Sequence, residues 1–342
     1  MIKILVVGNG FDKAHGLRTG YVDFLEWIEY ICGNRDVRVS QGEVKLTVAQ
    51  MRDSNSFQKK YPDEYDECVS YRNNFWVVHF EKIRDRVGEK WLDFESEIET
   101  FTKQVYKETR MESQKKVIRM ACDRHVDIPT FVNSKDMFKW LDVQLRQMTR
   151  LLEIYLCVYV NKTIGRDSRL DLFADIKANK LISFNYTSTY QDVYNKAISV
   201  DYIHGKARLD SEKNNCNLVL GYDDHYFESV DTVSELIPFE KYYQRIINGN
   251  SNNYFNWLEL KNRYGNVEEK EVHFYGHSLS PADGDIIKLL IEAENTRTKI
   301  YYRRNHEEDR ADMVKNLAVI LTPNGLIKRM GGLNPTIELI PV

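Results

Sequence analysis

The stretch MIKILVVGNG, residues 1–10, decides the fold class of this chain. Residues 2–7 are short, apolar and rich in β-branched side chains, which is typical of a buried strand, and Gly8-Asn9-Gly10 follows as a tight turn. A short helix over about 11–16 comes next. A strand, a Gly-x-Gly turn and a helix open the nucleotide-binding α/β folds, in which glycine lets the backbone approach a phosphate at the helix N-terminus.

This glycine loop is a weak signal on its own. Gly8 and Gly10 have the spacing that begins the motif G-x-G-x-x-G, but Gly16 follows too late to complete it. A tight structural turn that holds no ligand is therefore an alternative interpretation of residues 8–10.

Outward from the loop, strands and helices alternate along the chain. Thr19 can cap the helix that follows, and Ser280-Pro281 can start another, because serine and threonine are favoured N-caps and proline fits the first helical position. Strands alternating with helices predict an α/β fold with a mostly parallel, Rossmann-like sheet. Short apolar stretches predict its further strands at 181–184, 200–203, 217–221, 271–275, 299–303 and 336–340.

Two long segments interrupt this alternation. Residues of about 22–178 are almost wholly helical in pattern, and this is far more chain than one crossover between parallel strands needs. We therefore expect a large helical insertion or cap there, and a second, smaller helical insertion over about 225–265. Residues 1–342 then form a single α/β domain that carries both insertions.

Composition and charge exclude several classes of protein. The chain has 48 basic and 51 acidic residues and a net charge of −3, which argues against a broad nucleic-acid surface. Its five cysteines form no C-x-x-C pair, so we expect reduced thiols and no metal centre. We find no signal peptide and no apolar run of about 18 residues, which predicts a cytoplasmic protein that does not enter a membrane.

Three more polar loops directly follow predicted strands. Parallel sheets bind ligands at the carboxyl ends of their strands, so we expect these loops and the glycine loop to meet at one edge of the sheet. The loops are Ser183-Phe184-Asn185-Tyr186-Thr187, Ile203-His204-Gly205-Lys206 and Tyr275-Gly276-His277-Ser278-Leu279-Ser280.

The same segments resemble the AbiH family of bacteriophage abortive-infection proteins. The resemblance implies a protein of anti-phage defence, for which we further expect a phage-derived trigger and a homo-oligomer. It is carried by Ile4–Leu17, Trp91–Glu95, Ser183–Thr187, Ile203–Gly205, Phe274–Leu279 and Asn316–Leu321.

More distantly, the loops are similar to the NAD site of sirtuins and of sirtuin-like defence NADases. Gly8–Asp12 with Gly16-Leu17 resembles the sirtuin glycine loop, and Asn185 corresponds to the asparagine of the motif T-Q-N-I-D. His204-Gly205 matches the catalytic histidine and glycine, and Gly276–Leu279 resembles the loop G-T-S-L. The resemblance implies a sirtuin-like sheet that binds NAD.

Three departures narrow what this resemblance implies. Thr187 replaces the aspartate of T-Q-N-I-D, Asp12 replaces a serine, and the paired-cysteine zinc module is absent. The activity implied is therefore cleavage of the nicotinamide–ribose bond of NAD, and not deacylation of acyl-lysine.

His204 and Asn185 are the catalytic residues in this interpretation. The unperturbed pKa of histidine lies near neutral pH, so His204 is the expected base, and the amide of Asn185 can hold a water or a ribose hydroxyl. The alternatives are a hydrogen-bonded structural histidine at a strand end and an asparagine that closes a turn.

The other predicted site residues would hold the nucleotide. Asp12 and Ser280 each have an alternative role as a helix N-cap. The predicted nucleotide-binding residues are Gly8, Asn9, Gly10, Phe11, Asp12, Gly16, Gly276, Ser278 and Ser280.

Glu95 is a third catalytic candidate. It falls on the apolar stripe of a helix between Trp91 and Ile98, where a carboxylate must be paired or functional. The alternative is a structural role, in which Glu95 pairs with an arginine or caps a neighbouring helix.

Three functions fit these patterns. The first is an NAD-cleaving defence enzyme, and the second is a non-catalytic nucleotide-binding sensor or scaffold of phage defence. The third is a nuclease-like toxin, which the lack of a metal-binding carboxylate set and of a basic stretch disfavours. Release of nicotinamide from NAD would separate the first function from the second.

Overall fold

The apolar stretch at residues 2–7 forms a central strand. The computed structural model describes residues 1–32, 56–87, 93–122, 126–161, 169–209, 216–223 and 234–342, and in this part of the chain six strands form one parallel sheet. The predicted mostly parallel α/β sheet is thereby confirmed. Its strands are β1 (Ile2–Val7), β2 (Lys180–Ser183), β3 (Ser199–Tyr202), β4 (Lys270–Tyr275), β5 (Thr296–Tyr302) and β6 (Ile337–Pro341).

The strand order reverses direction beside β1. Neighbouring strands run β3-β2-β1-β4-β5-β6, which is the order of the doubly wound dinucleotide-binding fold. Val7 pairs with Ser183 on one side and with Tyr275 on the other, so three chain segments leave the sheet at the same level. In sheets of this kind, the crevice between β1 and β4 is the usual place for a ligand.

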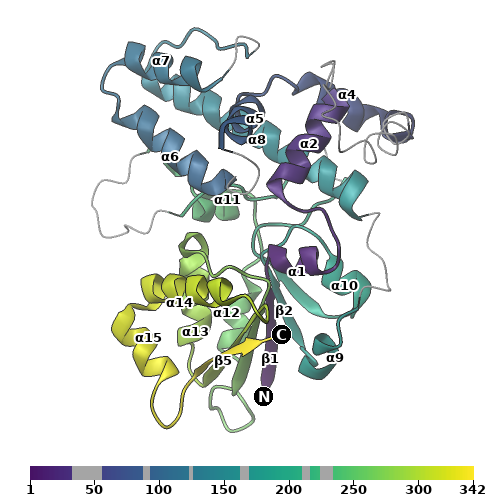
Figure 1. Cartoon of the computed structure of the whole chain (residues 1–342), viewed down its shortest axis with the longest axis vertical. Coiled ribbons are helices and arrows are strands. Elements are labelled where there is room, and N and C mark those ends of the chain that lie inside the picture. Colours follow the sequence, from purple (N-terminus) through teal and green to yellow (C-terminus); the bar gives the residue numbers. More distant parts are fainter. Residues whose placement is uncertain (33–55, 88–92, 123–125, 162–168, 210–215, 224–233) are drawn as a thin grey trace.

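Helices cover both faces of the sheet (Figure 1). Ile4 and Val6 belong to the core under α12 (Asn253–Leu258), α13 (Gly284–Glu292), α14 (Glu307–Leu321) and α15 (Pro323–Met330). Leu5 and Val7 belong to the opposite core, with α1 (Asn9–Ala14), α9 (Leu172–Ile176) and α10 (Thr189–Val193). Burial on both faces explains why this strand is a continuous apolar run. We call the sheet and these helices the sheet body.

The predicted strand at 217–221 is wrong. This segment is extended, but its backbone groups bond outside the sheet. The N–H of Val219 donates to the carbonyl of His204 at 2.9 Å, and the side chain of Gln244 bonds both the N–H and the carbonyl of Leu220, at 2.9 and 3.0 Å. Because a glutamine side chain satisfies this backbone, the apolar segment needs no neighbouring strand.

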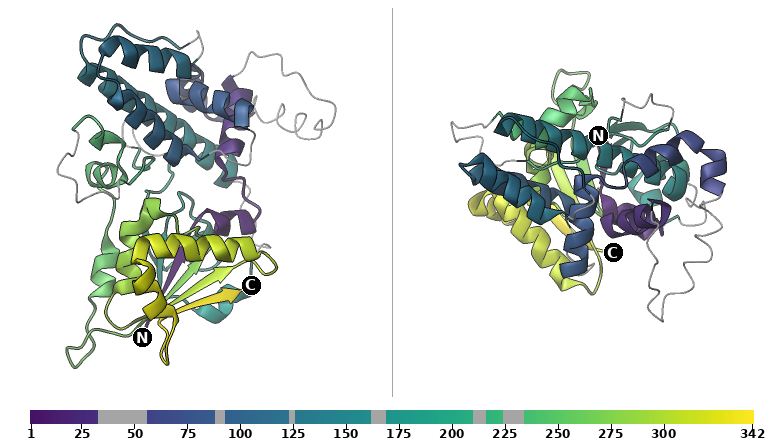
Figure 2. Two further views of the ribbon diagram at one scale, coloured as in Figure 1. Left: turned by 60° about the vertical axis from the view of Figure 1, so that its left-hand side comes forward. Right: turned by 90° about the horizontal axis from the view of Figure 1, so that it is seen from above.

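A helical cap stands over the carboxyl edge of the sheet (Figures 1 and 2). Its helices enclose a hydrophobic core that is separate from the two cores of the sheet body. The helical character expected for about 22–178 is found in the described part of that range. The helices are α2 (Tyr21–Cys32), α4 (Pro62–Ser70), α5 (Phe75–Val87), α6 (Phe94–Lys107), α7 (Met111–Ala121), α8 (Ser134–Tyr155) and its π-helical continuation η2 (Leu156–Val160).

The second predicted insertion divides between the two regions. Phe239, in the 3₁₀ turn η5 (Ile237–Phe239), packs against Trp76 and Phe138 of the helical cap, and α11 (Lys241–Ile247) follows directly. Helix α12, in contrast, packs on the sheet through Trp257. Residues 234–258 therefore link the cap to the sheet body.

The sequence predicts that no helix of this protein enters a membrane. Within the described ranges, none of the helices combines the length and the apolar character that a bilayer-spanning segment requires.

Candidate functional site

A cavity of about 960 Å³ lies at the carboxyl edge of the sheet, between loops of the sheet body and residues of the helical cap. The loops after β1, β2, β3 and β4 line it from the sheet body, and Tyr21, Glu95, Leu152 and Leu156 line it from the cap. Its volume suits a small-molecule ligand of nucleotide size.

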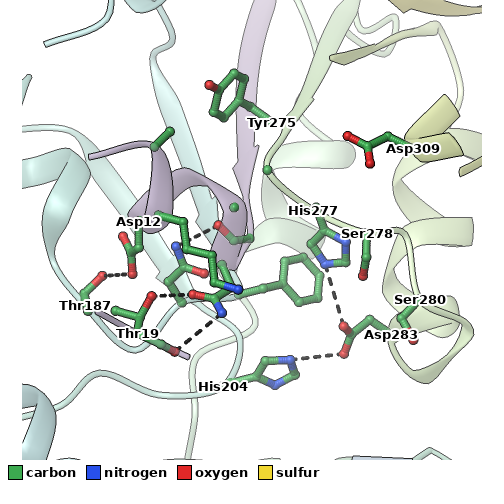
Figure 3. A pocket seen from close by; sticks show the side chains of 18 of the residues that line it. Asp12, Thr19, Thr187, His204, Tyr275, His277, Ser278, Ser280, Asp283 and Asp309 are labelled. Atoms are coloured by element: carbon green, nitrogen blue, oxygen red, sulfur yellow. Dashed lines mark hydrogen bonds and ion pairs between the residues drawn. The ribbon is translucent and has the colours of Figure 1, made fainter. Parts of the chain in front are cut away.

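Most of the predicted site residues line this one cavity, and Figure 3 shows several of them around it. The exceptions are Phe11 and Gly16. The predicted residues in the lining are Gly8, Asn9, Gly10, Asp12, Glu95, Asn185, His204, Gly276, Ser278 and Ser280.

Phe11 and Gly16 have structural positions instead. Phe11 is buried in an aromatic cluster, with its ring 5.2 Å from that of Phe173 and 6.1 Å from that of Tyr275. Gly16 follows α1 with φ +75°, a left-handed conformation that glycine adopts without strain. Neither residue reaches the cavity lining.

The glycines at 8 and 10 are explained by the loop after β4. A Cβ at Gly10 would lie 2.8 Å from the Cα of Gly276, and a Cβ at Gly8 would lie 2.8 Å from the Cα of His277. The N–H of Gly10 donates to the carbonyl of Gly276 at 2.7 Å. The space next to this turn is therefore occupied by backbone, and the alternative of a structural turn accounts for both glycines.

Asn185 ties the loop after β2 to the glycine loop. Its side-chain amide donates to the carbonyl of Gly8 at 3.0 Å, and its backbone N–H donates to the hydroxyl of Ser183 at 3.2 Å. Asn9 is fixed in a similar way, because the Thr19 hydroxyl donates to its side-chain oxygen. Thr19 therefore binds Asn9, and the predicted N-cap role of Thr19 is wrong.

Asp12 is a buried acid at the side of the cavity. Its Oδ2 accepts a hydrogen bond from the hydroxyl of Thr187 at 2.6 Å, and that hydroxyl also contacts the hydroxyl of Thr189 at 2.9 Å. Burial raises the pKa of Asp12 to about 6, although these hydroxyl groups favour the ionised form. Asp12 does not cap α1, since the cap residue is Gly8.

His204 and Asp283 form a buried pair. Nε2 of His204 lies 3.1 Å from Oδ1 of Asp283, and Nδ1 of His204 has no hydrogen-bond partner among the described residues. Burial lowers the pKa of His204, against the attraction of Asp283. Burial alone would raise the pKa of Asp283, but the Lys241 ammonium and His204 hold it well below its usual range.

These ionisation states determine the tautomer of His204. An ionised carboxylate only accepts hydrogen bonds, so the proton of neutral His204 lies on Nε2, facing Asp283. Nδ1 then carries a lone pair in a side chain that is 5% exposed. A buried imidazole nitrogen with a lone pair and no partner is suited to accept a proton from a bound molecule.

His277 approaches the other oxygen of Asp283. Its Nε2 lies 3.7 Å from Oδ2 of Asp283, and its Nδ1 accepts the N–H of Leu279 at 2.9 Å. Burial lowers the pKa of His277 to about 4. His277 is therefore neutral near pH 7 and holds the loop after β4 against the pair.

Lys241 joins Asp283 to Glu95 of the helical cap. We call His204, Asp283, His277, Glu95 and Lys241 the cluster. Nζ of Lys241 lies 2.8 Å from Oε2 of Glu95 and 2.8 Å from Oδ1 of Asp283. Burial, with the negative charge of Asp283, raises the pKa of Glu95, and the Lys241 ammonium opposes this. The apolar stripe predicted around Glu95 begins at Trp91, which lies outside the described residues. In the structure, α6 begins at Phe94, with Asp93 as its N-cap.

Sequence reasoning missed Asp283 and Lys241. Asp283 ends the 3₁₀ turn η6 (Pro281–Asp283), which Ser280 caps by accepting the N–H of Ala282 at 3.3 Å. An acid in the first turn of a helix is common for structural reasons, so its sequence position does not mark it as a site residue. Lys241 lies in the second insertion, with no motif around it. Within the described ranges, no group of three or more His, Cys, Asp or Glu side chains has the arrangement of a metal site.

Comparison with known families agrees with the motifs around this cavity. The family model described as bacteriophage abortive infection AbiH matches residues 4–302. The chain belongs to the AbiH family. It is therefore an abortive-infection protein of anti-phage defence. No curated protein and no solved structure matches it, so the AbiH match concerns the family and leaves the chemistry to be argued from the site.

Proposed function

We propose that this AbiH protein binds NAD in the cavity at the carboxyl edge of its sheet and hydrolyses the nicotinamide–ribose bond. The observation that carries the proposal is the buried His204–Asp283 pair at the carboxyl edge of a dinucleotide-type sheet. His204 lines the cavity, and its Nδ1 has no hydrogen-bond partner among the described residues. Most buried polar side-chain atoms in proteins have a hydrogen-bond partner, so a bound ligand or water is a natural partner for this nitrogen.

The proposed chemistry uses one water molecule. Breaking the bond between nicotinamide and ribose places positive charge on the ribose, and nicotinamide leaves as a neutral base. Nδ1 of His204 takes the proton of the water that attacks the ribose carbon, and that proton later passes to solvent. The products are ADP-ribose and nicotinamide. The ionised Asp283 stabilises the protonated His204 that forms.

Cavity residues other than the glycines would hold the nucleotide. The N–H of Gly10 is already bonded to Gly276, so it is not free for a phosphate. Lys13 and Ser278 line the same cavity and supply a positive charge and a hydroxyl for the diphosphate. Asn185, held at Gly8, lies between this region and His204 in the sheet and would orient a ribose hydroxyl.

The test is release of free nicotinamide from NAD by the purified full chain, with and without phage lysate. We expect slow or lysate-dependent release. Replacing His204 by asparagine removes the base, and the loss of a general base typically lowers a rate by about 10²–10⁴-fold. Calorimetric titration of H204N with NAD should still show binding, because the groups proposed for the diphosphate are unchanged.

A matched control shows whether the loss of activity is specific to His204 or follows from replacing any histidine. His306 is exposed and its side chain caps nothing, so His306→Asn should release nicotinamide at the wild-type rate. If the wild type binds NAD but never releases nicotinamide, even with phage lysate, the non-catalytic sensor is the correct function. If it neither binds nor cleaves NAD, the proposal is wrong.

A further inference from the structure

Lys241 lies where three parts of the molecule meet. Its ammonium contacts Glu95 of α6 in the helical cap at 2.8 Å, and Asp283 and the carbonyl of Ala282 in the sheet body at 2.8 and 3.3 Å. Lys241 itself belongs to α11, and its side chain is fully buried. All three N–H groups of one ammonium are thus used to join the cap, the second insertion and the sheet body.

The same contact reaches the proposed base. Oδ1 of Asp283 receives both the Lys241 ammonium, at 2.8 Å, and Nε2 of His204, at 3.1 Å. A change in the charge balance around Lys241 therefore changes the carboxylate that fixes the proton of His204. This connection passes through two side chains and needs no movement of the sheet.

We propose that Lys241 is a positioning residue that transmits contact between the helical cap and the sheet body to His204, with Glu95 as the contact on the cap. The proposal rests on the proposed function for the role of His204 as a base. It gives Glu95 a coupling role in place of the catalytic role expected from its sequence position, because Oε2 of Glu95 is already bonded to Lys241.

Charge balance gives the direction of the effect. The Lys241 ammonium lies 2.8 Å from Glu95 and from Asp283, and it favours the ionised form of both against the effect of burial. With the cap in contact and both carboxylates ionised, one negative charge remains beside His204 and favours its protonation. If the cap moves away, Glu95 leaves and Lys241 compensates Asp283 alone. His204 then becomes a weaker base. Because these groups are buried, the interactions are stronger than they would be in water.

Other polar and charged groups surround Lys241, Glu95 and Asp283. Each of them either moves together with Glu95 or has its own charged partner. From the cap, the hydroxyl of Tyr21 contacts Oε1 of Glu95 at 3.5 Å, and Asp93 caps the same helix, so both move with Glu95. From α11, Arg245 is paired with Asp285 at 2.8 Å.

Three titratable groups in or next to the cluster lie outside the cap. Burial raises the pKa of Asp223 to about 7, and Lys241 and Arg245 oppose this. His277 lies 3.7 Å from the second oxygen of Asp283. Tyr186, from the loop after β2, donates its hydroxyl to the carbonyl of Val219 at 2.8 Å and has a pKa raised by burial. Of these three, Tyr186 also packs against the hydrophobic core of the cap.

The test measures the pKa of His204 directly, by NMR titration of the histidine Cε1–H signals of the full chain without NAD. The His204 signal is identified by its loss in H204N. Glu95→Gln removes one negative charge at nearly constant shape and should lower the pKa of His204 by about half a unit or more. Lys241→Met removes the positive charge and should raise it. The matched control is Glu99→Gln, whose partner Lys103 lies on the same helix at the surface.

Opposite shifts distinguish coupling from loosening of the site. If Glu95→Gln leaves the pKa of His204 at the value in Glu99→Gln, or raises it, the coupling is disproved. Lys241→Met leaves two buried carboxylates and can fail to fold, and the result for Glu95→Gln then decides alone.

Nicotinamide release gives a separate answer. In an active protein, the acidic limb of its pH profile should move to lower pH in Glu95→Gln, together with the NMR value. If the wild type cleaves no NAD but the titration shows the expected shift, the coupling holds and the proposed function fails. If NAD is cleaved and the pKa of His204 does not respond to Glu95→Gln, the function holds and the coupling fails.

Discussion

The sheet body and the helical cap are built in different ways. Backbone ladders join residues distant in sequence in the sheet body, where Val7 pairs with both Ser183 and Tyr275. The cap is a nearly contiguous set of helices that pack through side chains around their own core. The ladders determine which loops meet at the cavity, whereas contacts made by side chains, such as that of Glu95 with Lys241, determine how the cap meets it. This difference separates what local sequence patterns can predict from what they cannot.

The largest loss of stability is expected at Gly276, where β1 and β4 end side by side. Gly276 has φ +64°, and a Cβ there would lie 2.1 Å from the backbone nitrogen of Phe11. Gly276→Val should therefore abolish folding of the sheet body, measured as soluble yield and by circular dichroism. Gly249 is the matched control, because it has φ +65° but nothing within 4 Å of its Cβ position. Gly249→Val should lose only about 1–2 kcal/mol of stability. Equal loss in both variants would contradict the close loop contact.

A pair of tryptophans tests whether the two regions unfold separately. Trp76 is buried in the cap, where its indole donates to the carbonyl of Leu141 at 3.0 Å, and Trp257 packs under the sheet. Truncation of a buried tryptophan to alanine costs about 3–5 kcal/mol. Trp76→Ala should raise amide hydrogen exchange in α5 and α8 and leave β1 and β4 protected, and Trp257→Ala should do the reverse. Exchange that rises everywhere in both variants would show one cooperative unit.

The smallest effect is a dependence of stability on pH in the sheet body. Burial raises the pKa of Asp12 to about 6 in the folded protein, above its usual value of 3.8. The folded state thus binds this proton more tightly than the unfolded chain, so the contribution of Asp12 to stability is present below pH 4 and is lost as pH rises through 6. Asp12→Asn should gain stability relative to wild type between pH 4 and 7, in urea unfolding. A constant difference across this range would show that Asp12 titrates normally.

The residues at the carboxyl edge of the sheet could be predicted from the sequence, because they directly follow the ends of the strands. A short apolar run followed by a polar loop marks both the strand and the position of its first loop residue, and this is how Asn185 and His204 were predicted to lie beside Gly8. Parallel pairing then brings such loops together without further information. Leu218-Val219-Leu220 has the same apolar pattern and is not a strand, because the side chain of a distant residue, Gln244, replaces the ladder.

The partners of His204 were not predictable, for a physical reason. Lys241 and Asp283 reach Glu95 and His204 through tertiary contacts whose spacing has no period along the chain. The burial that makes these charges important is itself a property of the assembled cap and sheet body. The reason for glycine at positions 8 and 10 was also not predictable from the sequence. A glycine that leaves space for a phosphate and a glycine that leaves space for a neighbouring loop have the same sequence pattern.

The pairing of Ile2 with Lys270 has a consequence for biosynthesis. A ribosome adds about 5–20 residues per second, so β1 is exposed for tens of seconds before its partner β4 has been made. During that time the cap helices, which lie between them in the chain, can already fold on local contacts. Until β4 is made, β1 can pair only with β2, and its other edge stays unpaired beside a formed cap. The cavity that Gly8 and Gly276 line is therefore complete only after β4 has been translated. An arrest of protein synthesis by a phage before that point would leave no assembled site.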